Sequence, residues 1–142
     1  MPQPAGQLLV YPMLDDRTAA RRDLDSVKHP VWNNTSNLTG WSSYLGGTPG
    51  APSVPEYAVP ARREDLSGLP PAWIGVGSLD LFLKESWAYA NRLTDAGIAC
   101  RFDEVSGAFH GFDGMAPATS VSKEFLDAQL SFLRKCLKLP LA

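Results

Sequence analysis

The sequence predicts an α/β fold, a short parallel sheet with flanking helices. Two apolar runs predict the sheet. Residues 7–13 and 72–77 lack polar alternation, as do strands that are covered on both faces. A third observation is the order of the elements: residues 72–77 lead directly into a helical pattern, and another strand-like segment follows at residues 98–105. Strands joined through helices are expected to run parallel, with right-handed crossovers.

The composition is typical of one globular domain. The chain has 142 residues, 44% of them hydrophobic and 20% charged, and a chain of this length buries roughly 70% of its surface on folding. A net charge of −2 without basic clusters argues against nucleic acid as a partner. No apolar run approaches the roughly 20 residues of a membrane span, and residues 1–4 lack the features of a secretion signal, so we expect a cytoplasmic protein. Cys100 and Cys136 are expected to be reduced core residues.

The first strand should end at Pro12, which cannot donate to a sheet ladder. Residues 14–70 then form an irregular excursion with charged, amide-rich and Gly/Pro-rich stretches. Within it, the spacing of Trp41, Tyr44 and Leu45 predicts one or two helical turns at residues 38–45. These side chains either pack locally or line a functional surface, and the pattern does not decide between the two.

The second half of the chain predicts two longer helices. The first follows the second strand, with Phe82, Ser86, Tyr89, Leu93 and Ala96 on one face and Gly97 just beyond its end. The last helix covers about residues 120–137. Its inward face is expected to carry five apolar side chains, namely Phe125, Leu126, Leu130, Leu133 and Leu137.

Two residues stand where parallel sheets place their active sites. Asp80 follows the second strand and His110 lies in the loop after the third, and the carboxyl ends of neighbouring strands share one rim. A carboxylate bonded to one imidazole nitrogen would leave the other free to take a proton from a nucleophile. Alternatively, Asp80 is a helix N-cap and His110 an ordinary loop residue between glycines. His29 has no such partner in the sequence and is expected at the surface.

Several blocks of the sequence resemble the hormone-sensitive-lipase branch of the α/β-hydrolases. The main block is LPPAWIGVGSLDLF at residues 69–82, followed by GAFHGF at residues 107–112. Upstream blocks are YPMLD at 11–15, YLG at 44–46 after Trp41, and YAVPAR at 57–62. Together these blocks, in this order, span nearly the whole chain.

The resemblance implies a partial α/β-hydrolase fold, in which the three strands are the family's strands 6 to 8. Residues 15–70 would form a cap-like excursion within a single unit, residues 1–142. By the same resemblance, Asp80 and His110 are the acid and base of a Ser-Asp-His triad, and the implied activity is that of a carboxylic ester hydrolase. The family commonly has a second acidic residue four positions after the acid, whereas this chain has Lys84, with Glu85 beside it.

Two family motifs are missing from the 142 residues. The nucleophile elbow G-x-S-x-G and the HGGG-type oxyanion loop both precede the sixth strand in the family, and neither is present here. We therefore expect this chain to be nearly inactive alone, and to act on a small ester only when a complementing N-terminal half supplies the nucleophile. The first strand would then be a bare apolar edge, which predicts a homo-oligomer or a complementing partner. The family also often dimerises through its eighth strand and last helix, here residues 98–105 and 120–137.

The sequence is compared with two other functions by its motifs: an interaction domain and a dinucleotide-binding loop. A non-catalytic remnant, kept as an interaction or oligomerisation domain, is favoured by the missing nucleophile. A dinucleotide-binding loop at residues 75–80 is disfavoured, because Asp80 stands where the third glycine would be. No cofactor is expected, and no spacing typical of metal ligands occurs in the sequence.

Overall fold

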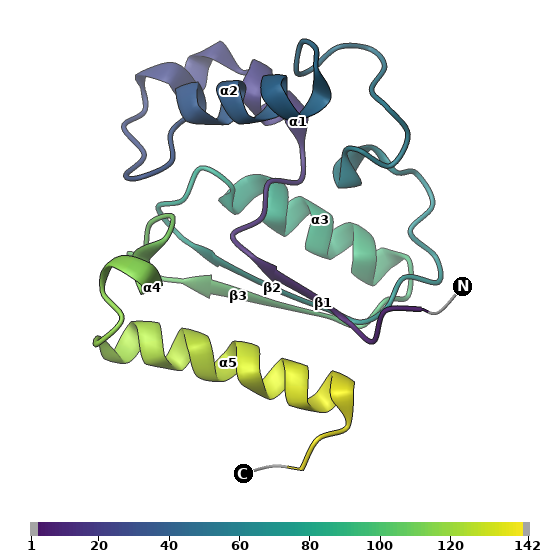
Figure 1. The fold of residues 1–142 in the computed structure, drawn as a ribbon, viewed down its shortest axis with the longest axis vertical. Coiled ribbons are helices and arrows are strands. Elements are labelled where there is room, and N and C mark those ends of the chain that lie inside the picture. Colours follow the sequence, from purple (N-terminus) through teal and green to yellow (C-terminus); the bar gives the residue numbers. More distant parts are fainter. Residues whose placement is uncertain (1–2, 141–142) are drawn as a thin grey trace.

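Three parallel strands form the centre of the protein, in a computed structural model that describes residues 3–140 (Figure 1). The strands are β1 (Gln7–Val10), β2 (Ala72–Gly77) and β3 (Cys100–Val105), in the order β1-β2-β3. Leu9 pairs with Ile74, and Ile74 with Phe102. The predicted α/β class and parallel sheet are therefore confirmed.

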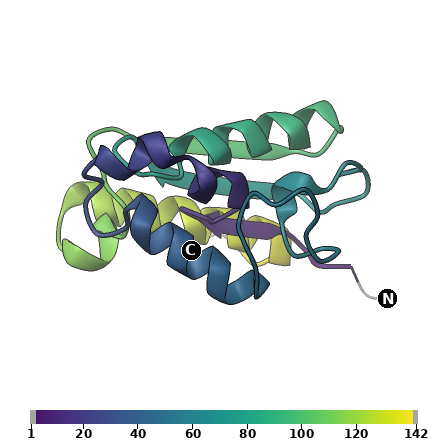
Figure 2. The same cartoon turned by 90° about the horizontal axis from the view of Figure 1, so that it is seen from above.

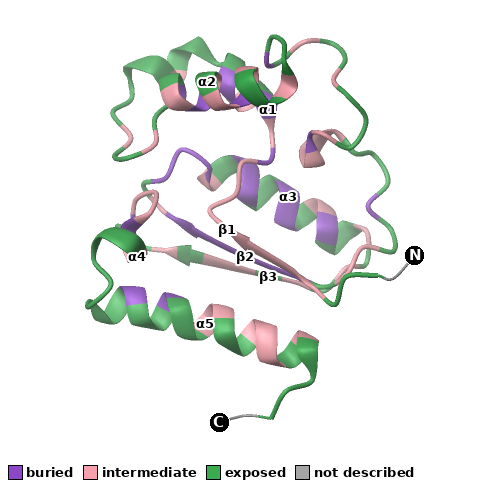
Figure 3. Cartoon of the chain, viewed as in Figure 1, coloured by how far each residue is buried: buried purple, intermediate pink, exposed green. Residues whose placement is uncertain are grey.

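Helices cover both faces of the sheet. Helix α3 (Leu83–Asp95) packs on one face and α5 (Ser120–Leu137) on the other, as Figures 1 and 2 show. The core beneath α3 includes Ile74, Tyr89 and Leu93, and the core beneath α5 includes Trp73 and Phe125. Because β2 lies between its neighbours and under both helices, all six of its residues are buried (Figure 3).

Residues between β1 and β2 form a separate layer beyond α3 (Figure 1). It contains α1 (Asp16–Ala20), the 3-10 turns η1 (Arg22–Ser26) and η2 (Pro60–Arg62), and α2 (Asn34–Leu45). Its small core consists of Ala19, Trp41 and Val59. The fully buried Asp16 forms an ion pair with Arg62 at 2.8 Å, which ties the beginning of this layer to its end.

Element boundaries differ from the predicted ones for local reasons. Strand β1 ends at Val10 because Tyr11 leaves the extended conformation, with a φ of 36°. Helix α2 begins at Asn34, earlier than residue 38, because the Asn33 side chain caps it by accepting from the backbone N–H of Ser36. Strand β3 begins at Cys100, since Ile98 still bonds back to the carbonyl of Leu93 at the end of α3.

The expected inward face of the last helix was largely wrong. Of the five apolar residues, Phe125 is buried, whereas Leu126, Leu130 and Leu137 are 51%, 40% and 55% exposed. The helix instead meets the narrow sheet along one stripe, with Ala128 and Phe132 beside Phe125. A three-stranded sheet offers too little surface to cover a wider helical face, so the leucines on its flank stay in solvent.

The two cysteines are free and half-buried. Cys100 packs against the core under α3, as expected in part, whereas Cys136 belongs to none of the core clusters of residues 3–140. Both line a cavity at the end of the sheet where β2 and β3 begin. Helix α4 (Phe112–Met115), a single turn, directly follows the loop that carries His110.

Candidate active site

Asp80 is held at the end of β2 by a tight turn and by the start of α3. Its backbone N–H bonds to the carbonyl of Gly77 at 3.1 Å, and the residue is only 5% exposed. Oδ1 accepts a hydrogen bond from the backbone N–H of Phe82 at 2.9 Å. The N-cap interpretation of Asp80 is therefore wrong, because the N-cap of α3 is Phe82 and no side chain caps it. The bond to Phe82 instead closes a turn just before the helix, and Oδ2 remains for another partner.

The second carboxylate oxygen contacts His110. Oδ2 of Asp80 lies 3.0 Å from Nδ1 of His110, and the side chains are 0% and 17% exposed. An ionised carboxylate can only accept hydrogen bonds, so the tautomer that makes this contact carries its proton on Nδ1. Nε2 is then the nitrogen free to accept a proton from a reacting group.

Backbone contacts between two loops bring these side chains together across 30 residues. The loop after β3 is joined to the end of β2 by a bond from the Leu79 N–H to the Ala108 carbonyl, 2.9 Å, and by one from the Gly107 N–H to the Ser78 hydroxyl, 2.8 Å. Gly77 allows this approach, since a Cβ there would lie 2.2 Å from the Ala108 carbonyl oxygen. Close packing thus explains a glycine that also fits a dinucleotide motif.

Three aromatic rings surround the imidazole of His110. Ring centroids lie 4.5 Å away for Tyr11, 5.5 Å for Phe82 and 5.9 Å for Trp32. Tyr11 and Trp32 were not predicted from the sequence as members of the site. The position of Tyr11 was a usable signal, because it follows β1 at the same rim as Asp80 and His110, whereas the place of Trp32 depends on the path of the long excursion.

Glu85, the acidic residue beside Lys84, is buried in the first turn of α3. It is 7% exposed, and its Oε1 accepts from the backbone N–H groups of Leu14 at 2.7 Å and Asp15 at 3.2 Å. Its Oε2 accepts from the Thr18 hydroxyl. Burial raises the pKa of Glu85 to about 7, although these three hydrogen bonds oppose the rise. Helix α3 is thereby fastened to the segment that follows β1.

No nucleophile completes the pair within the described part of the chain. Among residues 3–140, no serine hydroxyl is hydrogen-bonded to His110, and no group of three or more His, Cys, Asp or Glu side chains is placed to hold a metal ion. His29, expected at the surface, is half-buried, and its Nδ1 makes no hydrogen bond to residues 3–140. No helix within that range is long and apolar enough to cross a membrane.

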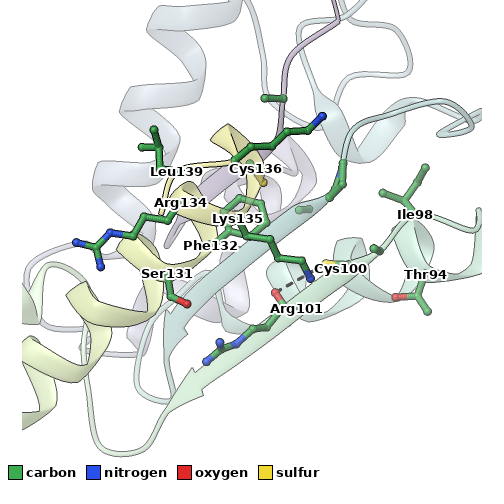
Figure 4. A pocket seen from close by; sticks show the side chains of 15 residues that line it. Thr94, Ile98, Cys100, Arg101, Ser131, Phe132, Arg134, Lys135, Cys136 and Leu139 are labelled. Carbon is green, nitrogen blue, oxygen red and sulfur yellow. Dashed lines mark hydrogen bonds between the residues drawn. The ribbon is translucent and has the colours of Figure 1, made fainter. Parts of the chain in front are cut away.

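A cavity of about 1180 Å³ lies at the opposite end of the strands (Figure 4). It is lined by the first residues of β2 and β3, Ala72 and Cys100, and by the last turns of α5. Neither Asp80 nor His110 borders it. The cavity is therefore separate from the acid–base pair.

A parallel sheet with a buried acid after one strand and its histidine after the next is the arrangement of the α/β-hydrolases. The chain belongs to this family: residues 1–114 match the family described as "alpha/beta hydrolase fold". Within it, the chain belongs to the hormone-sensitive-lipase-like branch, as the resemblance implied. A solved esterase of the bacterial hormone-sensitive lipase family is similar over 94% of the chain, with 27% identity and a TM-score of 0.77.

Other similar proteins are also esterases. A bacterial heroin esterase superimposes with a TM-score of 0.82 at 33% identity, over 94% of this chain and 43% of that one. Esterase LipW from Mycobacterium marinum gives 0.80 at 34% identity, over 93% and 40%. Esterase LipI of Mycobacterium tuberculosis is 27% identical over 70% of this chain, which corresponds to 31% of LipI. The chain thus spans less than half the length of these relatives.

Proposed function

We propose that residues 1–142 supply the acid and base of a carboxylic ester hydrolase of the Ser-Asp-His type. The observation that carries the proposal is the 3.0 Å contact between Asp80 Oδ2 and His110 Nδ1 at the carboxyl rim of the sheet. Support comes from the similarity to proteins named as esterases. The serine and the oxyanion-hole donors would come from a segment outside these residues.

In the proposed reaction, His110 moves one proton in each half. Nε2 takes the hydroxyl proton of the serine as its oxygen attacks the ester carbonyl, and then gives that proton to the departing alcohol. Water repeats the sequence on the acyl-enzyme and releases the acid. Asp80 keeps the imidazole in the required tautomer and stabilises the imidazolium that forms, as its buried carboxylate is placed to do.

Without the nucleophile, residues 1–142 should be nearly inactive. Loss of a triad serine alone lowers turnover by a factor on the order of 10⁶, and each missing oxyanion donor adds about 10²–10³. The excursion at residues 15–70 would act as a cap, since its Trp32 already forms part of the wall around His110. The substrate class we propose is a small ester.

A chimera tests the proposal. The part of the Mycobacterium marinum esterase that this chain does not match, including its nucleophile segment, is fused ahead of residue 1, and hydrolysis of a short acyl ester of p-nitrophenol is measured. We expect hydrolysis by the chimera and none above background by residues 1–142 alone. His110→Ala should abolish it, while His29→Ala is the control that retains it. An unaffected His110→Ala chimera would refute the assignment.

A second candidate is an interaction or oligomerisation domain, which one observation favours. Strand β1 is an edge of the sheet, and its four residues are only half-buried. Exposed edges pair readily with strands of other chains. Such a domain needs neither Asp80 nor His110, so the chimera assay distinguishes it from the esterase.

A further inference from the structure

Tyr11 adopts a backbone conformation that bulky residues avoid. Its φ of 36° lies in the left-handed region, at the point where β1 ends. Such a conformation is unfavourable for a residue with a side chain and persists only where surrounding contacts enforce it. One such contact is the bond from the Tyr11 N–H to the carbonyl of Gly75 on β2, 2.7 Å, which keeps the strained residue in register with the sheet.

The strained backbone directs the ring of Tyr11 against His110. The two rings meet edge to face, with centroids 4.5 Å apart and planes at 61°. The ring of Tyr11 also stacks on Phe125 of α5, with ring centroids 6.5 Å apart and planes at 12°. Phe125 is itself buried in the core between the sheet and α5, so the ring of Tyr11 packs against this core.

The hydroxyl of Tyr11 makes a weaker contact. It donates to Oδ1 of Asp113 in α4, three residues after His110, at 3.3 Å. This distance is long for an O–H···O hydrogen bond. Burial and the Asp113 carboxylate raise the pKa of Tyr11, so the phenol keeps its proton. The hydroxyl bond is therefore weak, and the part of Tyr11 that faces the imidazole of His110 is its ring.

We propose that Tyr11 is a positioning residue for His110. Its ring fixes the plane of the imidazole so that Nδ1 stays directed at Asp80 and Nε2 faces the rim of the sheet. The positioning role of Tyr11 rests on the proposed function. The contact between Tyr11 and His110 can be tested without enzyme activity, because it lies entirely within residues 3–140.

NMR on the ¹⁵N-labelled chain of 142 residues tests the proposal through the imidazole itself. We expect the wild type to show a solvent-protected Nδ1 proton on His110 in one tautomer. Tyr11→Ala should lose that protection and show both tautomers, whereas Tyr11→Phe should resemble the wild type. Tyr11→Gly removes the ring and also the strain, because glycine adopts a positive φ freely. It therefore reports on the ring even if Tyr11→Ala folds poorly.

Tyr57 provides a matched control within the same chain. It is also a tyrosine with a positive φ, 65°, but it is 77% exposed and its ring lies below the guanidinium of Arg63. Tyr57→Ala should leave the His110 signals unchanged. An unchanged His110 spectrum in Tyr11→Gly would overturn the proposal. Absence of the protected proton in the wild type would instead refute the Asp80–His110 pair, and with it the proposed function, so the two failures are distinguishable.

Discussion

Asp80 serves two partners with its two carboxylate oxygens. One holds the entrance to α3 through the Phe82 N–H, and the other holds His110. Of the two roles that the sequence left open for Asp80, the helix N-cap falls to Phe82, and the contact with His110 is the one expected of a triad acid. A single buried side chain couples the geometry of a helix start to the orientation of an imidazole.

Gly77 offers a prediction at this scale. A methyl group at this position would lie 2.2 Å from a backbone oxygen that cannot swing away, so Gly77→Ala should push the His110 loop from the end of β2. Overpacking of this kind costs about 1–3 kcal/mol. Chemical denaturation should show the loss. Gly47→Ala is the control, because nothing lies within 4 Å of its added methyl group. Equal stability of the two variants would contradict the role given to Gly77.

At the scale of elements, the segment after β1 is attached to a helix of the α/β core. Helix α3 binds it through Glu85, whose carboxylate bonds to Leu14, Asp15 and Thr18. The same segment leads into the layer that contains Trp32, whose ring lies beside His110. A buried carboxyl group thus joins the helix that begins near the acid to the layer that helps enclose the base.

Glu85 predicts a pH dependence of stability. Its pKa is about 7 in the folded protein and 4.5 ordinarily, so between these values the folded state binds more protons than the unfolded state. The free energy of unfolding should therefore fall as pH rises from about 4.5 to 7, by about 3 kcal/mol from this group. Glu85→Gln, which keeps an acceptor for both N–H groups, should lose this component.

Urea denaturation at several pH values measures the difference between Glu85→Gln and the wild type. Subtracting the two curves removes the contribution of other carboxylates. Glu124→Gln, at an exposed position of α5, is the control that should follow the wild type at every pH. A constant difference between Glu85→Gln and the wild type across this range would contradict the prediction.

Sequence patterns predicted the elements better than their contacts. The order of strands and helices, and the meeting of Asp80 with His110, followed from the shared rim of parallel strands. Glu85 was missed as an anchor because a charged residue in the first turn of a helix normally faces solvent. The leucines of α5 were misassigned because helical spacing shows that a stripe exists but not how much of it a narrow sheet can cover. The position of Trp32 beside His110 could not be predicted, because it depends on the path of some twenty residues without a regular sequence pattern.

At the scale of the whole molecule, apolar surface remains uncovered on two sides. The β1 edge is half-buried, and α5 exposes leucines including Leu126, Leu130 and Leu137. Both sides were expected to join chains, and we retain an oligomer as a proposal. Apolar surface that is contiguous and exposed commonly marks an interaction site.

Light scattering on the purified chain checks the oligomer. We expect a mass greater than that of one chain, and Leu130→Glu should lower it if α5 forms the contact, because a charge would be buried in the interface. Lys123→Glu is the control for a change of charge at another exposed position on the same helix. A monomer at all concentrations for the wild type would contradict the prediction.

The central claim, that Asp80 and His110 act as one acid–base unit, is tested most directly by a double-mutant cycle in the active chimera. Rates of ester hydrolysis are measured for Asp80→Asn, His110→Ala and the double variant. Asp80→Asn should cost on the order of 10⁴ by favouring the wrong tautomer. Because His110→Ala already removes the base, the double variant should be no slower than His110→Ala, within about twofold. A double variant slowed by the product of the two single losses would show that the residues act independently and would contradict the claim.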